Sequence, residues 1–91
     1  MEIKKGENMF YVGDSEDSVK AKMTYVPSGE NIIIIDGTFV SSELRGQGVG
    51  KKLLKEIVDW CRKENKKIVP LCPYAKAQIE KNNEYHDMIH K

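Results

Sequence analysis

The sequence predicts a single α+β domain over residues 1–91, with a mixed sheet and two main helices. In the first half of the chain, apolar and polar side chains alternate over short segments, a period of two that is typical of half-exposed strands. From about residue 48 the apolar residues recur with the period of a helix, and a short apolar segment and a second helical segment follow. A chain of this length buries one modest core, so we expect no second domain.

Three strands are predicted in the first part of the chain, joined by two turns. The first covers residues 9–12, which are apolar and aromatic, and the glycine and acidic residues at 13–17 predict a turn. Residues 19–25 alternate apolar side chains with two lysines and a threonine, which predicts a half-exposed strand, and the Pro-Ser-Gly sequence at 27–29 predicts a second turn. The third strand covers residues 31–40.

The third strand contains a run of isoleucines, Ile32 to Ile35, followed by Asp36 and Gly37. The isoleucine run predicts burial on both faces and therefore a central place in the sheet. A glycine inside a strand marks a bulge or a close approach of the backbone, so we expect an irregularity at Asp36-Gly37.

An amphipathic helix follows and ends near Asn65. Its apolar stripe is formed by Val49, Leu53, Leu54, Ile57, Val58, Trp60 and Cys61. We expect Trp60 and Cys61 to belong to the core, because large aromatic and free thiol side chains at such positions are usually buried.

The last part of the chain predicts a short strand at 67–71, ended by Pro73, and a second helix at 75–81. A strand–helix–strand connection is by default a right-handed crossover, which makes the third strand and strand 67–71 parallel. The tail at 84–91, which carries His86 and His90, gives no clear pattern, and we expect it to fray in solvent.

Composition excludes several classes of protein. The formal net charge is +1, whereas a general nucleic-acid binder carries a marked basic excess, so we expect no nucleic-acid partner. No segment approaches the roughly 20 apolar residues that cross a bilayer, and the N-terminus has no signal-peptide core. We therefore expect a cytoplasmic protein without a membrane partner. Its two cysteines are then reduced thiols, and their spacing does not resemble a metal site.

Three glycines alternate between cations where the third strand gives way to the helix. Gly46, Gly48 and Gly50 lie between an arginine at 45 and lysines at 51 and 52. The N-terminus of a helix presents unpaired N–H groups, and glycines would let a phosphate reach them. The alternative is a glycine-rich turn beside solvated lysines. The spacing G-x-G-x-G fits neither the dinucleotide fingerprint nor the P-loop.

The segment R-G-Q-G-V-G at residues 45–50 resembles the acyl-CoA loop of the GNAT N-acetyltransferase superfamily, written [RQ]-x-x-G-x-[GA]. The segment V-P-L-C-P-Y at 69–74, with Glu84 and Tyr85, is similar to a group of minimal GNAT-like proteins of roughly this length. The resemblance covers nearly the whole chain. It implies a truncated GNAT-like fold in which the parallel strand pair splays apart. Full-length members carry additional N-terminal helices, and without them we expect an open acceptor side.

The resemblance also implies a binding mode for acetyl-CoA. The pyrophosphate would lie on the loop amides and the pantetheine arm would pair with the end of the third strand. The residues implied are Phe39, Val40, Arg45, Gly46, Gln47, Gly48, Val49, Gly50, Lys51 and Lys52. A bulge at Asp36-Gly37 would free backbone N–H groups to polarise the thioester carbonyl. No metal is implied.

The activity implied is acetyl transfer from acetyl-CoA to an amine, which could belong to a protein, a polyamine or a small molecule. A non-catalytic acyl-CoA-binding or regulatory module is the alternative, and either would be a monomer or a weak dimer. Several acid–base residues of the family are replaced. Ile79 occupies the position of a common tyrosine, Gln78 replaces a tyrosine of the minimal group, and Gly37 and Phe39 replace a histidine and a glutamate. Tyr74 and Tyr85 match neither tyrosine position.

Cys72 is the one candidate catalytic residue. It lies where the second parallel strand ends and the last helix begins, and ligands of such sheets gather at the carboxyl ends of strands. A thiolate there could accept the acetyl group and pass it on. The alternatives are a place in the site without covalent chemistry, and simple packing.

Overall fold

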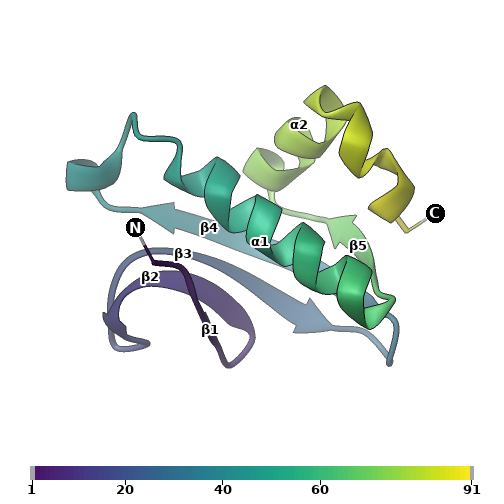
Figure 1. The fold of residues 1–91 in the computed structure, drawn as a ribbon, viewed down its shortest axis with the longest axis horizontal. Helices are drawn as coiled ribbons and strands as arrows, with labels where there is room; N and C mark the ends of the chain where they lie inside the picture. The colour runs from purple at the N-terminus through teal and green to yellow at the C-terminus, as the bar shows by residue number, and fades with distance from the viewer. Residues whose placement is uncertain (1, 91) are drawn as a thin grey trace.

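The structure is a computed structural model that describes residues 2–90. It contains one five-stranded sheet in the order β1-β2-β3-β4-β5, in which β1 to β4 pair antiparallel and β4 pairs with β5 in parallel (Figure 1). The elements are β1 Lys4–Gly6, β2 Met9–Ser15, β3 Ser18–Pro27, β4 Ile32–Val40, the 3-10 helix η1 Ser42–Leu44, α1 Val49–Glu64, β5 Lys67–Pro70, α2 Pro73–Lys81 and the 3-10 helix η2 Asn83–Met88. The predicted mixed sheet with a parallel pair and two main helices is confirmed.

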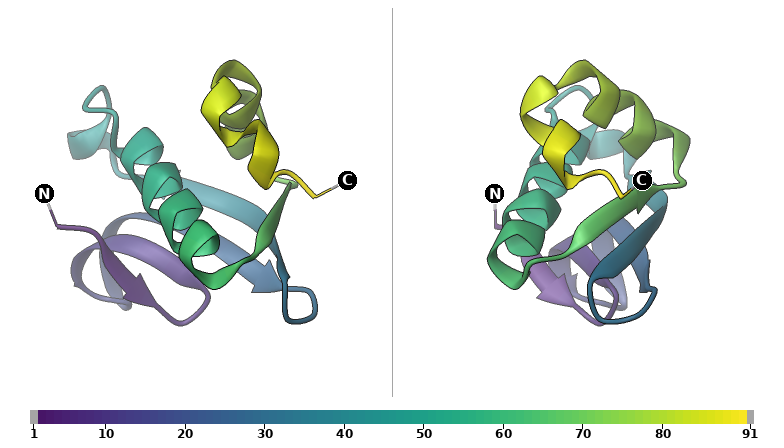
Figure 2. Two further views of the ribbon diagram at one scale, coloured as in Figure 1. Left: turned by 45° about the vertical axis from the view of Figure 1, so that its right-hand side comes forward. Right: turned by 90° about the vertical axis from the view of Figure 1, so that its right-hand side faces the viewer.

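Both main helices cover the same face of the sheet (Figure 2). The buried apolar residues of α1, α2 and the strands form one cluster around Met23, Ile35, Leu53 and Ile57. Burial alternates along β3, so the side chains between the core residues lie on the opposite face. No helix formed by residues 2–90 packs on that opposite face, which we call the bare face.

Burial on β4 corrects one expectation. Ile33 and Ile35 are buried, but Ile32 and Ile34 are only half-buried. The two side chains left half-buried lie on the bare face, where no helix packs, so the isoleucine run does not mean burial on both faces. The middle strand of the sheet is β3, and β4 lies between it and the edge strand β5.

The expected irregularity in β4 is a β-bulge. Tyr25 pairs with Ile35 and Thr24 pairs with Gly37, so Asp36 is the extra residue with no partner on β3. The bulge separates a first half of β4, which also pairs with β5, from a second half that pairs with β3 alone.

The N-terminal hairpin extends further than the sequence predicts. β1 is a strand that the pattern does not reveal, because Lys-Lys-Gly carries no apolar alternation. It pairs Gly6 with Met9 around a tight turn, where Asn8 adopts a φ of 58°. β2 continues to Ser15 through part of the expected turn at 13–17, and its register shifts around Gly13 accommodate the extension.

The C-terminal tail packs against α1 instead of fraying. The Arg62 guanidinium donates to Asp87 at 2.6 Å, and Met88 is buried in the core. The hydrogen bond from Arg62 is the main reason why the pKa of Asp87 is lowered. Beyond η2, the His90 N–H donates to the Ile68 carbonyl at 2.9 Å, so the end of the tail is hydrogen-bonded to β5.

Candidate functional site

The glycine loop leads from η1 into the first turn of α1. Gly46 and Gly48 adopt φ values of 84° and 70°, in the left-handed region that favours glycine. A Cβ added at either position would meet no heavy atom within 4 Å. Gly48 caps α1 without a side-chain hydrogen bond, so no side chain at the cap satisfies the first N–H groups of the helix. The loop is thus an open cradle of backbone at the positive end of α1.

Positive charge around this cradle comes from three exposed side chains, Arg45, Lys51 and Lys52. None of the three forms an ion pair with another of residues 2–90. Gln47 is exposed and its amide donates to the Glu43 carbonyl at 3.3 Å. The Val49 side chain is buried in the core, so this residue offers only its backbone to the loop. The arrangement favours an anion bound by backbone N–H groups with cations beside it.

Gly50 allows α2 to pack closely against the first turn of α1. A Cβ on Gly50 would lie 2.6 Å from the Tyr74 hydroxyl oxygen, which is shorter than any ordinary contact. Tyr74 lies in the first turn of α2, directly after Pro73. The third glycine of the loop therefore brings the two helices together where both begin.

Replacement of Gly50 by alanine tests this contact. Alanine raises helix propensity by up to about 1 kcal/mol, but its methyl group must displace the Tyr74 ring, and overpacking costs about 1–3 kcal/mol. We expect the free energy of unfolding, measured in urea, to fall by about 1 kcal/mol. In a Tyr74→Leu background the same replacement should be neutral or stabilising. A stabilised Gly50→Ala single variant would show that the contact imposes no constraint.

β4 and β5 separate at the bulge. Their last pair is Ile35 with Pro70, and the Leu71 and Cys72 N–H groups both donate to the Ile35 carbonyl, at 3.0 and 2.9 Å. β5 ends there, while β4 continues to Val40. Within the described part of the chain, no strand pairs with this last segment of β4 on its β5 side. An extended ligand can therefore pair with it as an added strand would.

Cys72 lies at this separation and caps the N-terminus of α2. Its sulfur is 3.3 Å from the Thr38 hydroxyl oxygen, and the residue is buried, with 7% of its surface exposed. Tyr74 follows two residues later, and burial, then the nearby Cys72, raise the pKa of its phenol. The phenol is thus a neutral hydrogen-bond donor at physiological pH.

The structure brings most of the expected site residues to one end of the molecule. The loop, the end of β4 with Phe39 and Val40, and Cys72 meet where β4 and β5 end and where α1 and α2 begin. This is the carboxyl edge of the parallel pair, where ligands bind in such sheets. The sequence reasoning missed Thr38 as the partner of the thiol, although Thr38 belongs to the predicted strand.

Other residues considered from the sequence lie elsewhere. Ile79 is buried, and Trp60 and Cys61 belong to the core or pack against it, as expected. His86 contacts the Glu80 carbonyl at 3.3 Å, in η2. Tyr85 packs against the core from the same segment. None of these five side chains contacts Cys72 or the loop in a hydrogen bond among residues 2–90.

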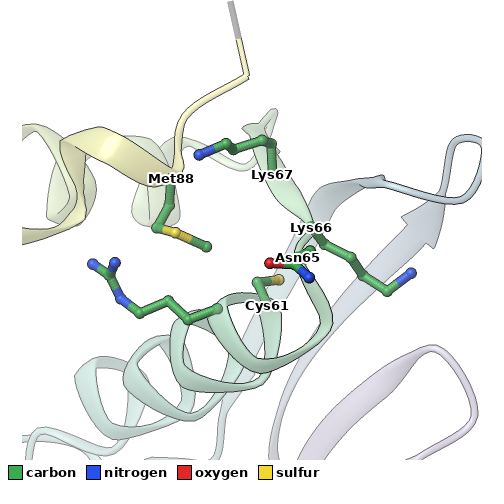
Figure 3. A pocket seen from close by; sticks show the side chains of 6 residues that line it. Cys61, Asn65, Lys66, Lys67 and Met88 are labelled. Carbon is green, nitrogen blue, oxygen red and sulfur yellow. The ribbon is translucent and has the colours of Figure 1, made fainter.

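A cavity of about 280 Å³ lies at the opposite end of α1 (Figure 3). Its lining residues are Cys61, Arg62, Asn65, Lys66, Lys67 and Met88. The cations are already engaged: Lys66 and Lys67 donate to the carbonyls of Glu30 and Asp87, both at 2.7 Å. Burial raises the pKa of the Cys61 thiol to about 12, so it stays protonated and unreactive. This cavity therefore offers neither the open backbone N–H groups nor the unpaired cations that the glycine loop offers.

Residues 2–90 contain no cluster of three or more histidine, cysteine, aspartate or glutamate side chains placed to hold a metal ion. Neither main helix, nor any other helix within those residues, has the length and apolar character needed to span a bilayer.

Comparison with known proteins gives one consistent picture. The family model of the GCN5-related N-acetyltransferases matches residues 9–88. A GCN5-like protein from Staphylococcus aureus, studied by NMR and named as a candidate N-acetyltransferase, is 50% identical with a TM-score of 0.82. The match covers 98% of this chain and 87% of that one. No curated protein matches the chain.

More distant structures share the fold. The ribosomal-protein-S18-alanine N-acetyltransferase from Escherichia coli is 18% identical with a TM-score of 0.62, and the match covers 85% of this chain and 53% of that one. A GNAT family acetyltransferase from Elizabethkingia anophelis, solved with acetyl-CoA bound, is 16% identical with a TM-score of 0.58 and covers 85% and 51%. The chain spans about half the length of these two proteins.

Proposed function

The chain belongs to the GCN5-related N-acetyltransferase family, which uses acetyl-CoA, and from this premise we propose how its own residues carry the transfer of an acetyl group to an amine. The proposal rests on one observation, that three features of the structure lie close together. An open backbone cradle, an unpaired segment of β4 and a thiol all meet at one edge of the sheet. A cradle, an extended slot and a reactive centre are what a thioester of coenzyme A requires.

The loop would hold the pyrophosphate. Gly46 and Gly48 leave open space where a side chain would otherwise project, so the residues fit a bulky anion. The backbone of residues 46–51 would donate to the phosphate oxygens, and Arg45, Lys51 and Lys52 would add charge at the edge of the cradle. Arginine and lysine at an exposed edge supply attraction without closing the site.

The pantetheine arm would lie along β4. The segment Thr38 to Val40 has no strand on its β5 side, so it can pair with an amide-containing chain. Phe39 and Val40 would contact the arm through their backbone, because their side chains point to the two faces of the sheet. The bulge at Asp36 breaks the regular ladder beside the place where the thioester would lie.

Acetyl-CoA supplies an activated acetyl group, and we assign its first acceptor on the protein to the Cys72 sulfur. A bond would form between this sulfur and the acetyl carbon while the bond to the CoA sulfur breaks, and the proton of the thiol would leave with CoA. The acceptor amine would then attack the acetyl-cysteine, and the thiol would recover a proton from the amine. Thr38, 3.3 Å from the sulfur, would orient it.

Thermal unfolding tests the binding part of the proposal. A ligand present at 100 times its Kd stabilises the folded state by about 2.7 kcal/mol, which raises the Tm of a domain of this size by about 10 °C or more. We expect acetyl-CoA and CoA to produce such a shift, and ATP and NAD at equal concentration to produce much less. Equal shifts from all four compounds would mean a generic phosphate site and would contradict the proposal.

A further inference from the structure

Tyr74 carries a hydroxyl group that no other group among residues 2–90 pairs with. The residue lies in the first turn of α2, and its phenol ring packs against Gly50 in the first turn of α1. No hydrogen bond joins its hydroxyl to any residue in that range. Within the same range, Ser41 Oγ is the one fully buried side-chain oxygen or nitrogen without a partner, so the Tyr74 hydroxyl is open to solvent. It is therefore a donor that a ligand can reach.

The Tyr74 phenol is close to both ends of the proposed acetyl-CoA site. At the start of α1, the first N–H to bond within the helix is that of Lys52, which donates to the Gly48 carbonyl at 3.1 Å. The N–H groups of residues 49–51, against which the phenol packs, are thus left for the pyrophosphate. Cys72 caps the turn of α2 that carries Tyr74, and burial, then this nearby thiol, raise the pKa of the phenol. The phenol therefore lies between the pyrophosphate end and the thioester end of the site.

Gly50 shows that the chain gives up a side chain to bring this phenol to the start of α1. Gly50 has an ordinary helical φ, so its backbone does not require a glycine, and glycine is less favourable than alanine inside a helix. A Cβ at this position would lie 2.6 Å from the Tyr74 hydroxyl oxygen. The lack of a side chain at residue 50 is therefore explained by the place that the hydroxyl occupies.

The pantetheine arm of acetyl-CoA needs a donor at this place. An extended arm that pairs with β4 forms hydrogen bonds with the strand along one edge only. Its other edge faces the side of β4 where β5 ends and α2 begins. An amide carbonyl on that edge loses its water when the arm binds, and an unpaired buried carbonyl is costly. A neutral phenol donates one O–H, which suits a neutral carbonyl oxygen, whereas the phosphates already have N–H groups and cations beside them.

We propose that Tyr74 is a binding residue for the acetyl donor, and that its hydroxyl donates a hydrogen bond to an amide carbonyl of the pantetheine arm. The inference rests on the proposed function, because the glycine loop and Cys72 define the two ends of the arm. The hydrogen stays on Tyr74, so the phenol holds the arm and does not protonate the CoA sulfur. Binding of the donor thereby links the starts of α1 and α2 through the ligand.

Isothermal titration of Tyr74→Phe with CoA tests the inference. Phenylalanine keeps the ring against Gly50 and removes only the hydroxyl, so the Tm of the ligand-free protein should stay the same. We expect the Kd of CoA to rise about fivefold, the loss of one neutral hydrogen bond. Tyr85→Phe is the matched control, because it removes the same atom from a half-buried phenol in η2, and it should leave the Kd unchanged. An unchanged Kd in Tyr74→Phe would overturn the inference.

Shortened ligands locate the hydrogen bond along the cofactor. Desulfo-CoA keeps the pantetheine arm but lacks the sulfur, and Tyr74→Phe should weaken its binding by the same factor as that of CoA. ADP carries a pyrophosphate without the arm, and its Kd, measured by NMR titration, should be the same in the two proteins. Equal binding of desulfo-CoA to wild type and variant would place the phenol at the sulfur. A weaker binding of ADP to the variant would place it at the phosphates, and either result would overturn the inference.

The wild-type protein separates this inference from the proposed function. If CoA does not bind the wild-type protein, the proposed function fails, and the inference fails with it. If CoA binds the wild-type protein and Tyr74→Phe with the same Kd, only the present inference fails. A clear fall in the Tm of ligand-free Tyr74→Phe would show that the hydroxyl supports the fold, and it would also overturn the inference.

Discussion

Replacement of Gly48 by alanine is expected to weaken acetyl-CoA binding at least tenfold, about 1.4 kcal/mol, while the protein still folds. Gly48 caps α1 with a φ of 70°, and a methyl group there would enter open space instead of the protein interior. The open space is where we place the pyrophosphate. The methyl group therefore obstructs the ligand and leaves the packing of the protein unaffected. Isothermal titration with CoA measures the loss directly.

The chain offers a matched control for backbone strain. Gly29 has a φ of 79° in the turn between β3 and β4, and a Cβ there would also meet nothing within 4 Å. Gly29→Ala should therefore lose about the same 1 kcal/mol of folding free energy as Gly48→Ala, because both force a side chain into the left-handed region. Only Gly48→Ala should lose affinity for CoA. Equal affinities in the two variants would place the pyrophosphate elsewhere.

The sequence predicts the strands and helices that have strong periodicity. The helix that begins at Val49 follows from its apolar stripe. The parallel pairing of β4 with β5 follows from the right-handed crossover that a strand–helix–strand connection forms. β1 could not be predicted, since Lys-Lys-Gly forms a strand only because Met9 to Tyr11 pair with it. The packing of the tail could not be predicted either, because it depends on the Arg62–Asp87 pair, whose members are distant in sequence.

In the candidate site, too, local features could be predicted from the sequence and contacts between distant elements could not. The loop is local, so six consecutive residues and their context are enough to predict its place at the N-terminus of α1. The contacts of Asp36 with Thr24 and of Thr38 with Cys72 join different elements, and they depend on the register of the sheet. A one-residue change in register would turn each of these side chains to the other face. The bulge could be suspected from Asp36-Gly37, but the direction of the carboxylate could not.

The two cysteines illustrate how position determines reactivity. Cys61 is fully buried on α1, and its pKa is raised to about 12, mainly by burial. Cys72 lies beside the gap, at the N-terminus of α2, with the Thr38 hydroxyl oxygen 3.3 Å from its sulfur. Of the two thiols, only that of Cys72 therefore lies where the proposed function requires one.

Cys72→Ser is accordingly expected to abolish acetylation of the protein itself and to lower turnover at least about a hundredfold, because the loss of a nucleophile removes a covalent route and not merely a contact. Mass spectrometry after incubation with acetyl-CoA alone should show one acetyl group on the wild-type protein, released by hydroxylamine, and none on the variant.

Cys61→Ala should keep the label, at a cost in stability of about 1–3 kcal/mol from the cavity that it leaves. Affinity for CoA should be nearly unchanged in Cys72→Ser, since the loop and the β4 segment remain. If the wild-type protein stays unlabelled and the serine variant turns over normally, the amine attacks the bound thioester directly. In that case Thr38 and Cys72 serve only to shape the gap.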